Sequence, residues 1–212
     1  MIRTIKIALF AVLLICCLSI AAAPQPRLVQ APDDWTLDVN YEQLHQIELR
    51  IGKDRKPMRF WYVILTITNN SGQDINFYPM CELVTDTFQI IPSGSQTPPE
   101  VFANIQKRHK RTYPFLEVLQ PTGTRILQGQ DNTRDFAVIW PDFDSKAKEL
   151  SLFIAGLSSE TAAVEKPARN DSDEPTTVYL RKTLALSYSI SGDPVFRSRP
   201  KLTFKGQNWV MR

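Results

Sequence analysis

The sequence predicts a mainly β fold, an antiparallel β-sandwich that carries a short helical insertion. Three observations lead to this fold class. Apolar residues recur with a period of two, which is the period of a β-strand that buries one face. Residues that favour turns separate these runs, and no long helical pattern alternates with them. Such a pattern favours antiparallel sheets over a fold of alternating strands and helices.

The longest predicted strand covers residues 59–69, and both of its faces are apolar, as in a central strand. Trp61, Val63, Leu65 and Ile67 form one face, and Phe60, Tyr62 and Ile64 form part of the other. Shorter alternating runs precede this strand at residues 35–39 and 47–51. The run from Asn69 to Gly72 predicts a turn, and Ile75 to Phe77 predicts the returning strand of a hairpin.

Further strands are predicted at residues 82–91, 136–140, 150–154 and 177–190. Turn-forming residues end the last of them at Ser191-Gly192-Asp193-Pro194. The most apolar faces of all these strands are expected to pack together in one core. They are contributed by Trp61, Val63, Leu65, Ile67, Leu152, Ile154, Leu184 and Leu186.

One helix is predicted, inside a long insertion at about residues 93–130. Thr97-Pro98-Pro99-Glu100 has the pattern of a capping box with proline at the first helical position. Val101, Phe102 and Ile105 then form an apolar face that we expect to dock on the sandwich. The polar stretch 158–176 predicts a mobile loop, and residues 22–33 predict a flexible lead. Residues 34–212 are therefore expected to form a single domain.

Residues 1–21 predict a cleaved signal peptide. Arg3 and Lys6 form a basic start, residues 7–20 are almost entirely apolar, and Ala21 supplies the small side chain that a signal peptidase needs. A membrane anchor requires about 20 apolar residues, and prolines follow this shorter run at once. The mature chain is therefore expected to be exported to the periplasm, the cell surface or the medium, with no membrane span.

A lipid-anchored envelope protein is an alternative. Leu14-Ile15-Cys16-Cys17 is similar to a bacterial lipobox, in which Cys17 would be acylated, but the apolar run continues past Cys17. Loss of Cys16 and Cys17 with the signal would leave Cys81 alone, so no intramolecular disulfide is expected. Removal of the two basic residues of the signal lowers the net charge from +3 by two, to +1, which gives little support to nucleic-acid binding.

The sequence contains no established catalytic motif, and we expect neither an enzyme nor a cofactor. His45 and His109 are the two histidines of the chain. Cations beside His109 are expected to lower its pKa and to hinder a role as a base. The alternative is a hydrolase that uses Asp142, Asp144 or Asp131 together with His109.

Two weak candidates for metal ligation are present. Asp142 and Asp144 alternate in a loop, as calcium ligands do, but the rest of an acidic ladder is missing. Turn formation is the favoured role for these aspartates. Met80 and Cys81 carry sulfur ligands that suit copper(I), but no histidine is near them in sequence, so a buried cysteine is favoured. No metal site is predicted.

Two basic segments are candidate binding surfaces. The first contains Lys107, Arg108, Lys110 and Arg111, with Tyr113 and Phe115 beside them. The second, at the C-terminus, contains Arg197, Arg199, Lys201, Lys205 and Arg212. Recognition usually resides on loops that a rigid scaffold presents, so the first segment is preferred. Its expected partner is an anionic envelope polysaccharide or an envelope protein.

Several segments together suggest a family resemblance. They are Thr66-Ile-Thr-Asn-Asn-Ser-Gly72, residues 132–157, Arg181-Lys-Thr-Leu-Ala-Leu-Ser-Tyr188, Gly192-Asp193-Pro194 and Trp209-Val-Met-Arg212. On these segments, the chain resembles uncharacterised exported β-sandwich proteins of environmental bacteria. The resemblance covers most of the mature chain and implies an immunoglobulin-like sandwich outside the cytoplasm. It implies no catalytic residues.

Overall fold

The computed structural model describes residues 26–31, 33–52, 56–166, 176–192 and 201–212, and this part of the chain is mainly β. The predicted signal peptide at residues 1–21, with Cys16 and Cys17, lies outside it. Its strands are β1 (Arg27–Val29), β2 (Asp38–Tyr41), β3 (His45–Arg50), β4 (Pro57–Asn69), β5 (Ile75–Phe77), β6 (Met80–Thr85), β7 (Ile90–Pro92), β8 (Glu117–Val118), β9 (Thr124–Ile126), β10 (Gly129–Pro141), β11 (Glu149–Ala155), β12 (Thr161–Lys166), β13 (Thr176–Ser191) and β14 (Lys201–Met211). One helix, α2 (Pro99–His109), is described.

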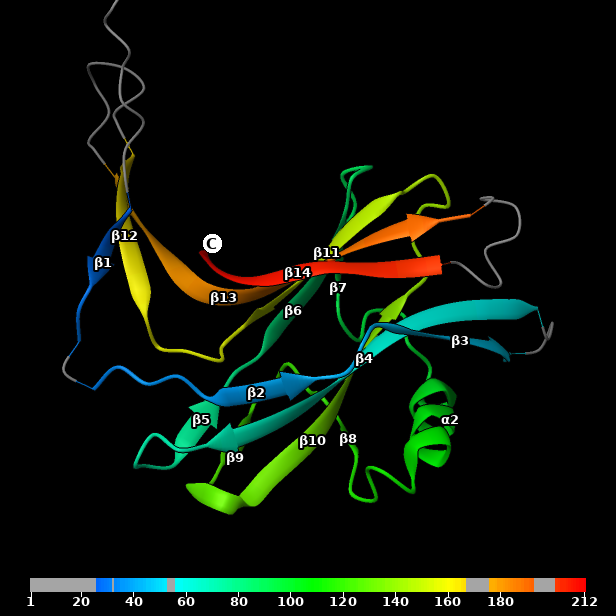
Figure 1. The fold of residues 1–212 in the computed structure, drawn as a ribbon, viewed down its shortest axis with the longest axis horizontal. Coiled ribbons are helices and arrows are strands. Elements are labelled where there is room, and N and C mark those ends of the chain that lie inside the picture. The colour runs from blue at the N-terminus through cyan, green and yellow to red at the C-terminus, as the bar shows by residue number, and fades with distance from the viewer. Residues whose placement is uncertain (1–25, 32, 53–55, 167–175, 193–200) are drawn as a thin grey trace, which may run out of the picture.

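Hydrogen bonds arrange these strands in three sheets (Figure 1). The seven-stranded sheet has the order β1-β12-β13-β11-β6-β7, with β14 on the other edge of β13. The five-stranded sheet has the order β2-β4-β10-β8, and β3 pairs with β4 beside β2. β5 and β9 form a small third sheet. The strand pairs are antiparallel except for the short pair of β8 with β10, so the predicted mainly β, antiparallel fold class is confirmed.

The two larger sheets share one hydrophobic core. β4 and β10 contribute to it from one sheet, and β6, β11 and β13 contribute from the other. All eight predicted core residues, from Trp61 on β4 to Leu186 on β13, are buried in this cluster, so the predicted core is confirmed. Alternation along each strand brings the apolar faces together, because every second side chain points to the same side of a sheet.

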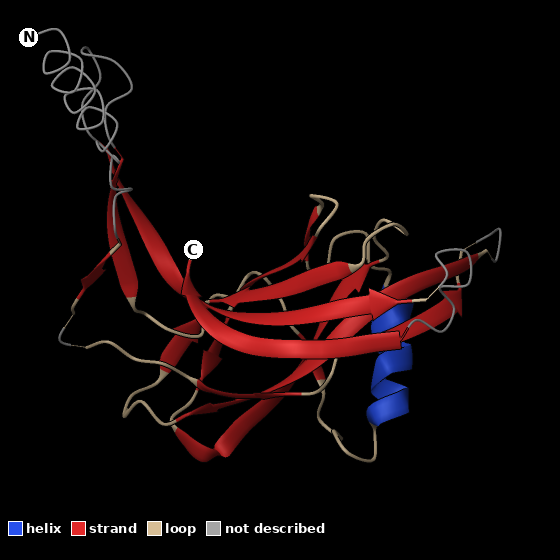
Figure 2. Ribbon diagram, turned by 45° about the horizontal axis from the view of Figure 1, so that its top comes forward, coloured by secondary structure: helices blue, strands red, loops and turns tan. Residues whose placement is uncertain are grey.

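The opposite face of the five-stranded sheet is covered by α2, which is blue in Figure 2. Val101 and Ile105 of α2 are fully buried in a second cluster with Phe60, Tyr62 and Ile64 of β4. Phe102 packs against the same cluster, so the predicted docking face of the helix is confirmed. Cover on both faces explains why β4 is apolar and buried without interruption from Phe60 to Leu65, unlike a strand with one face in water.

Four segments differ from the expectations. Residues 82–91, predicted as one strand, belong to two strands, β6 and β7, which pair with each other. Ile75 to Phe77 pairs with β9 and not with β4, because β4 is already paired with β2 and β3 on one edge and with β10 on the other. Residues 161–166, expected to be loop, form β12, which pairs with β13 and β1. Residues 27–29 of the expected flexible lead form β1. In β12, the small side chain of the buried Ala162 allows the strand to pack without the large apolar residues that usually mark a strand.

Candidate functional site

The start of α2 differs by one residue from the prediction. Pro98 is extended, with φ −64° and ψ 147°, and no side chain caps the helix. Thr97, the expected cap, donates its hydroxyl hydrogen bond to the carbonyl of Ser95 instead. A residue that precedes a proline is disfavoured in the helical region, so Pro98 stays outside and Pro99 becomes the first helical residue. The expected capping box is therefore wrong, and the expected proline at the first helical position is present.

The other end of α2 is attached to the sheet by side-chain hydrogen bonds. His109 Nε2 and the hydroxyl of Tyr62 lie 2.9 Å apart. Arg108 Nη1 donates to the carbonyl of Gln46 at 3.2 Å and to the hydroxyl of Tyr62 at 3.3 Å. Just past the helix, the hydroxyl of Tyr113 donates to Glu42 Oε1 at 2.7 Å. These bonds fix the C-terminal turn of α2 over β3 and β4.

Both histidines of the chain belong to this polar cluster. His45 Nε2 lies 2.8 Å from Glu42 Oε2, and the His45 ring stacks on Tyr62 with 5.2 Å between ring centroids. The rings of His45 and His109 meet edge to face, with 5.5 Å between centroids. Glu42 and His45 were not singled out from the sequence, because they precede His109 by more than sixty positions and no motif links them.

The cluster shifts the acid–base behaviour of its members. Partial burial, together with the nearby charges of His45 and Arg108, lowers the pKa of His109 against the opposing effect of Glu42. Burial opposes ionisation of Glu42, but hydrogen bonds from Tyr113 and His45 lower its pKa. Burial and the hydrogen bond to Glu42 raise the pKa of Tyr113 to about 12. Near neutral pH, the cluster therefore favours an ionised Glu42 beside a neutral His109.

Five of the six predicted binding residues are exposed, and Tyr113 is half-buried. Lys107, Lys110 and Arg111 are exposed, and within the described part of the chain none of them forms an ion pair. The side chain of Phe115 is 84% exposed. We call these four residues the basic patch. Its cations lie in the last turn of α2 and just after it, where the helix dipole favours positive charge.

Arg108 is also exposed, but its guanidinium binds Gln46 and Tyr62 of the five-stranded sheet, whereas the half-buried Tyr113 binds Glu42 between β2 and β3. Arg108 follows Val101 and Ile105 at the spacing that repeats one face of a helix, so it lies on the side that docks. The hydroxyl of Tyr113 donates a hydrogen bond to Glu42, and this bond holds the Tyr113 side chain toward the protein.

The acidic candidates lie elsewhere. Asp142 Oδ1 accepts a hydrogen bond from Trp61 Nε1 at 2.8 Å, on the face of β4 that points into the core between the sheets. His109 binds Tyr62 on the opposite face, so the sheet separates Asp142 from His109. Asp144 accepts a hydrogen bond from the backbone of Lys146, a turn contact, and Asp131 lies near the start of β10.

The sulfur candidates do not converge. Cys81 is buried, and burial raises the pKa of its thiol to about 12, whereas Met80 is 55% exposed on the opposite face of β6. Among the described residues, no group of three or more histidine, cysteine, aspartate or glutamate side chains is placed to hold a metal ion.

Within the described residues, the C-terminal basic segment contains both exposed cations and one cation that is held in an ion pair. Arg197 and Arg199 lie outside the described residues. Lys201 and Lys205 are exposed on β14. Arg212 forms an ion pair with Glu82 at 2.6 Å and lies over the ring of Phe153.

Comparison with known proteins adds no relative, because no protein-family model, curated protein or solved structure matches the chain. Where the structure describes the chain, it contains no helix with the length and apolar character needed to cross a membrane.

Proposed function

We propose that this chain is an exported, non-catalytic binding module of the cell envelope, built on an immunoglobulin-like β-sandwich, and that its basic patch binds an anionic polysaccharide. The observation that carries the proposal is the exposure of Lys107, Lys110 and Arg111 beside Phe115, with no ion pair formed by these cations among the described residues. Unpaired cations on one surface attract polyanions, and an exposed aromatic ring offers a flat contact for a sugar.

The rigidity of α2 supports a binding role for the patch. Val101 and Ile105 of the helix are fully buried, and Arg108 and His109 at its C-terminal end bind the sheet. Tyr113, just past the helix, binds Glu42. A surface that is already ordered loses little conformational entropy when a ligand binds. The polar groups beneath the patch are engaged with one another, which favours a structural role for this cluster over a catalytic one.

The proposal is tested by replacing Lys107, Lys110 and Arg111 with serine and measuring binding to polygalacturonate at low salt. Each exposed ion pair contributes about 0.2–1 kcal/mol, so loss of three is expected to weaken binding by about 3-fold to 150-fold. Wild-type binding should also weaken steeply between about 0.1 M and 1 M salt, because the Debye length falls from about 10 Å to 3 Å.

A matched control replaces Lys56, Lys146 and Lys166, which are exposed on other parts of the surface. It changes the net charge equally, so its binding should stay close to that of the wild type. Equal losses in both variants would show a general charge effect and would refute the patch. Unchanged binding by the patch variant, with an intact circular dichroism spectrum, would also refute it.

The N-terminal part of the proposal is tested by the intact mass of the processed protein. A mass that begins at Ala22 supports export by signal cleavage. A lipid-modified chain that begins at Cys17 supports the anchored alternative, and a mass that includes Met1 contradicts both.

A further inference from the structure

A cavity of about 230 Å³ is lined in part by residues of β5 and of the start of β12. In Figure 1 these two strands lie on the opposite side of the molecule from α2. Its lining combines aromatic, hydroxyl, amide and guanidinium groups. These come from Trp35, Asn76, Tyr78, Ser158, Thr161 and Arg181. The volume is below the range of about 300–1,000 Å³ that suits drug-sized ligands, so the cavity fits a small unit such as one sugar ring.

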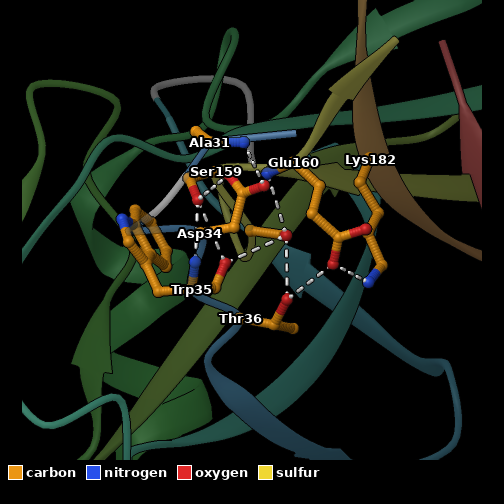
Figure 3. A network of polar contacts seen from close by, with 8 residues as sticks. Ala31, Asp34, Trp35, Thr36, Ser159, Glu160 and Lys182 are labelled. Atoms are coloured by element: carbon orange, nitrogen blue, oxygen red, sulfur yellow. Dashed lines mark hydrogen bonds and ion pairs between the residues drawn. The ribbon is translucent and has the colours of Figure 1, made fainter. Parts of the chain in front are cut away.

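A hydrogen-bond network holds the backbone of Trp35 in place (Figure 3). The Trp35 N–H donates to Ser159 Oγ at 2.8 Å, and the Trp35 carbonyl accepts from the Ser159 N–H at 3.0 Å and from Ser158 Oγ at 3.1 Å. The hydroxyls of Thr36 and Ser158 lie 2.8 Å apart. The network thus joins two segments separated by more than 120 positions, and it holds the backbone of Trp35, which lines the cavity.

The network continues to β13 through Glu160. Glu160 is bound by the hydroxyl of Thr36 and forms an ion pair with Lys182, which precedes the pairing of β13 with β11. The neighbouring Arg181 is held by two backbone hydrogen bonds with Arg212, at 2.8 and 3.0 Å. The backbone that carries Arg181 is therefore ordered on both sides.

Two glycines position the second aromatic wall, Tyr78. A Cβ on Gly123 would lie 2.5 Å from Cδ1 of the Tyr78 ring, and a Cβ on Gly156 would lie 2.5 Å from the Tyr78 carbonyl oxygen. Both glycines have positive φ, +88° and +92°. Tyr78 is 63% exposed although its surroundings fit it this closely. An exposed ring that is held in place is typical of a contact surface for a ligand.

Several polar groups of the lining have no partner in the described structure. The guanidinium of Arg181, the amide of Asn76 and the hydroxyl of Tyr78 take part in no hydrogen bond or ion pair among the described residues. Arg181 is also exposed. The lining therefore combines one planar cation, neutral hydrogen-bonding groups and two aromatic residues.

We infer that this cavity binds a single acidic sugar unit, a pyranose that carries a carboxylate. Arg181 would hold the carboxylate through paired N–H donors, the geometry in which guanidinium recognises carboxylate. Asn76 and the hydroxyls of the lining would bind the sugar hydroxyls, and Trp35 and Tyr78 would contact the apolar face of the ring. This site is separate from the basic patch and does not depend on the function proposed for it.

The test is titration of the ¹⁵N-labelled protein with galacturonate, followed by NMR. The indole N–H of Trp35 is expected to shift with saturable binding, and galactose, which lacks the carboxylate, is expected to bind about tenfold more weakly or worse. Arg181→Gln should reduce galacturonate affinity by a similar factor and should leave the weak galactose binding unchanged. Tyr78→Ser should weaken both sugars.

Two variants serve as controls. Lys205→Gln removes an exposed cation from β14 and should bind galacturonate as the wild type does. The basic-patch triple variant should also retain this binding, so the two proposals can fail separately. Equal affinity for galactose and galacturonate, an unchanged affinity in Arg181→Gln, or no shift of the Trp35 signal up to the solubility limit would each overturn the inference.

Discussion

Replacing Asp142 with alanine is expected to destabilise the protein, because the Asp142 carboxylate binds both Trp61 and Arg59 at the edge of the hydrophobic core. Its Oδ1 accepts the hydrogen bond from the fully buried Trp61, and its Oδ2 lies 3.3 Å from Nη1 of Arg59, whose side chain is only 17% exposed. Arg59 Nε already lacks a hydrogen-bond partner in the described structure. The alanine variant leaves the Trp61 N–H without an acceptor.

A buried donor that loses its partner costs about 1–3 kcal/mol. The side chain of Asp142 is 36% exposed, so water can enter the vacated position and satisfy part of this need. The expected loss for Asp142→Ala is therefore in the lower half of that range, about 1–2 kcal/mol. Asp142→Asn keeps an oxygen for Trp61 and loses only the charge near Arg59, so it should cost about 1 kcal/mol or less.

Urea unfolding followed by circular dichroism measures both losses. In a chain of this size, the alanine variant should also melt about 2–8 °C lower. Asp144→Ala is the matched control, because the Asp144 carboxylate accepts a hydrogen bond from the backbone of Lys146 in an exposed turn and contacts no buried group that the described structure records. An Asp142→Ala variant within about 0.5 kcal/mol of the wild type would refute this account, as would an equal loss in Asp144→Ala. If added calcium raised the melting temperature of the wild type but not of Asp142→Ala, Asp142 would instead be a metal ligand.

Four further outcomes follow from the structure. Leu65→Ala, in a fully buried position of β4, should lower the free energy of unfolding by about 2–5 kcal/mol, and a loss below about 1 kcal/mol would contradict its central place. Gly156→Ala should cost more than Gly72→Ala, because both glycines have φ near +90° but only Gly156 meets another atom within 4 Å; equal losses in unfolding experiments would contradict this. The pKa of His109 is lowered in the folded protein, so its contribution to stability is present above the unfolded value of about 6.5 and is lost as the pH falls below it; His109→Gln should flatten the decline in melting temperature between about pH 7 and 5. The thiol of Cys81 should not react with a thiol reagent until the protein unfolds, and dithiothreitol should not change the melting temperature.

The strands that were predicted correctly carry strong local signals. β4, β10, β11 and β13 each present several large apolar residues at every second position, and each lies between two neighbouring strands. A central strand packs against neighbouring layers, so it needs apolar residues, and its composition therefore indicates that it is central. The helix was also predictable, because Val101 and Ile105 repeat at helical spacing after a pair of prolines.

The segments that were missed form edges. β1 and β12 lie at one end of the seven-stranded sheet, and β12 uses Ala162 and Ala163 where central strands use larger residues. β5 pairs with β9, which is about fifty residues away in the sequence, and only the occupied edges of β4 explain why the nearer hairpin does not form. Pairing at an edge is decided by which partners remain available, and a period-two pattern does not contain that information.

The two proposed sites differ in the same way. The basic patch was predictable because its cations are contiguous in sequence, and the helix needed only to be docked for Lys107, Lys110 and Arg111 to remain exposed. The cavity joins Trp35, Tyr78 and Arg181, which lie on three separate segments and have no common motif. Its strongest local signals are the glycines that make room for Tyr78, but a single glycine in a sequence marks a turn as readily as a close approach. A site assembled by tertiary contacts therefore becomes visible only when the unpartnered groups of separate segments are found around one cavity, as Arg181 and Asn76 are here.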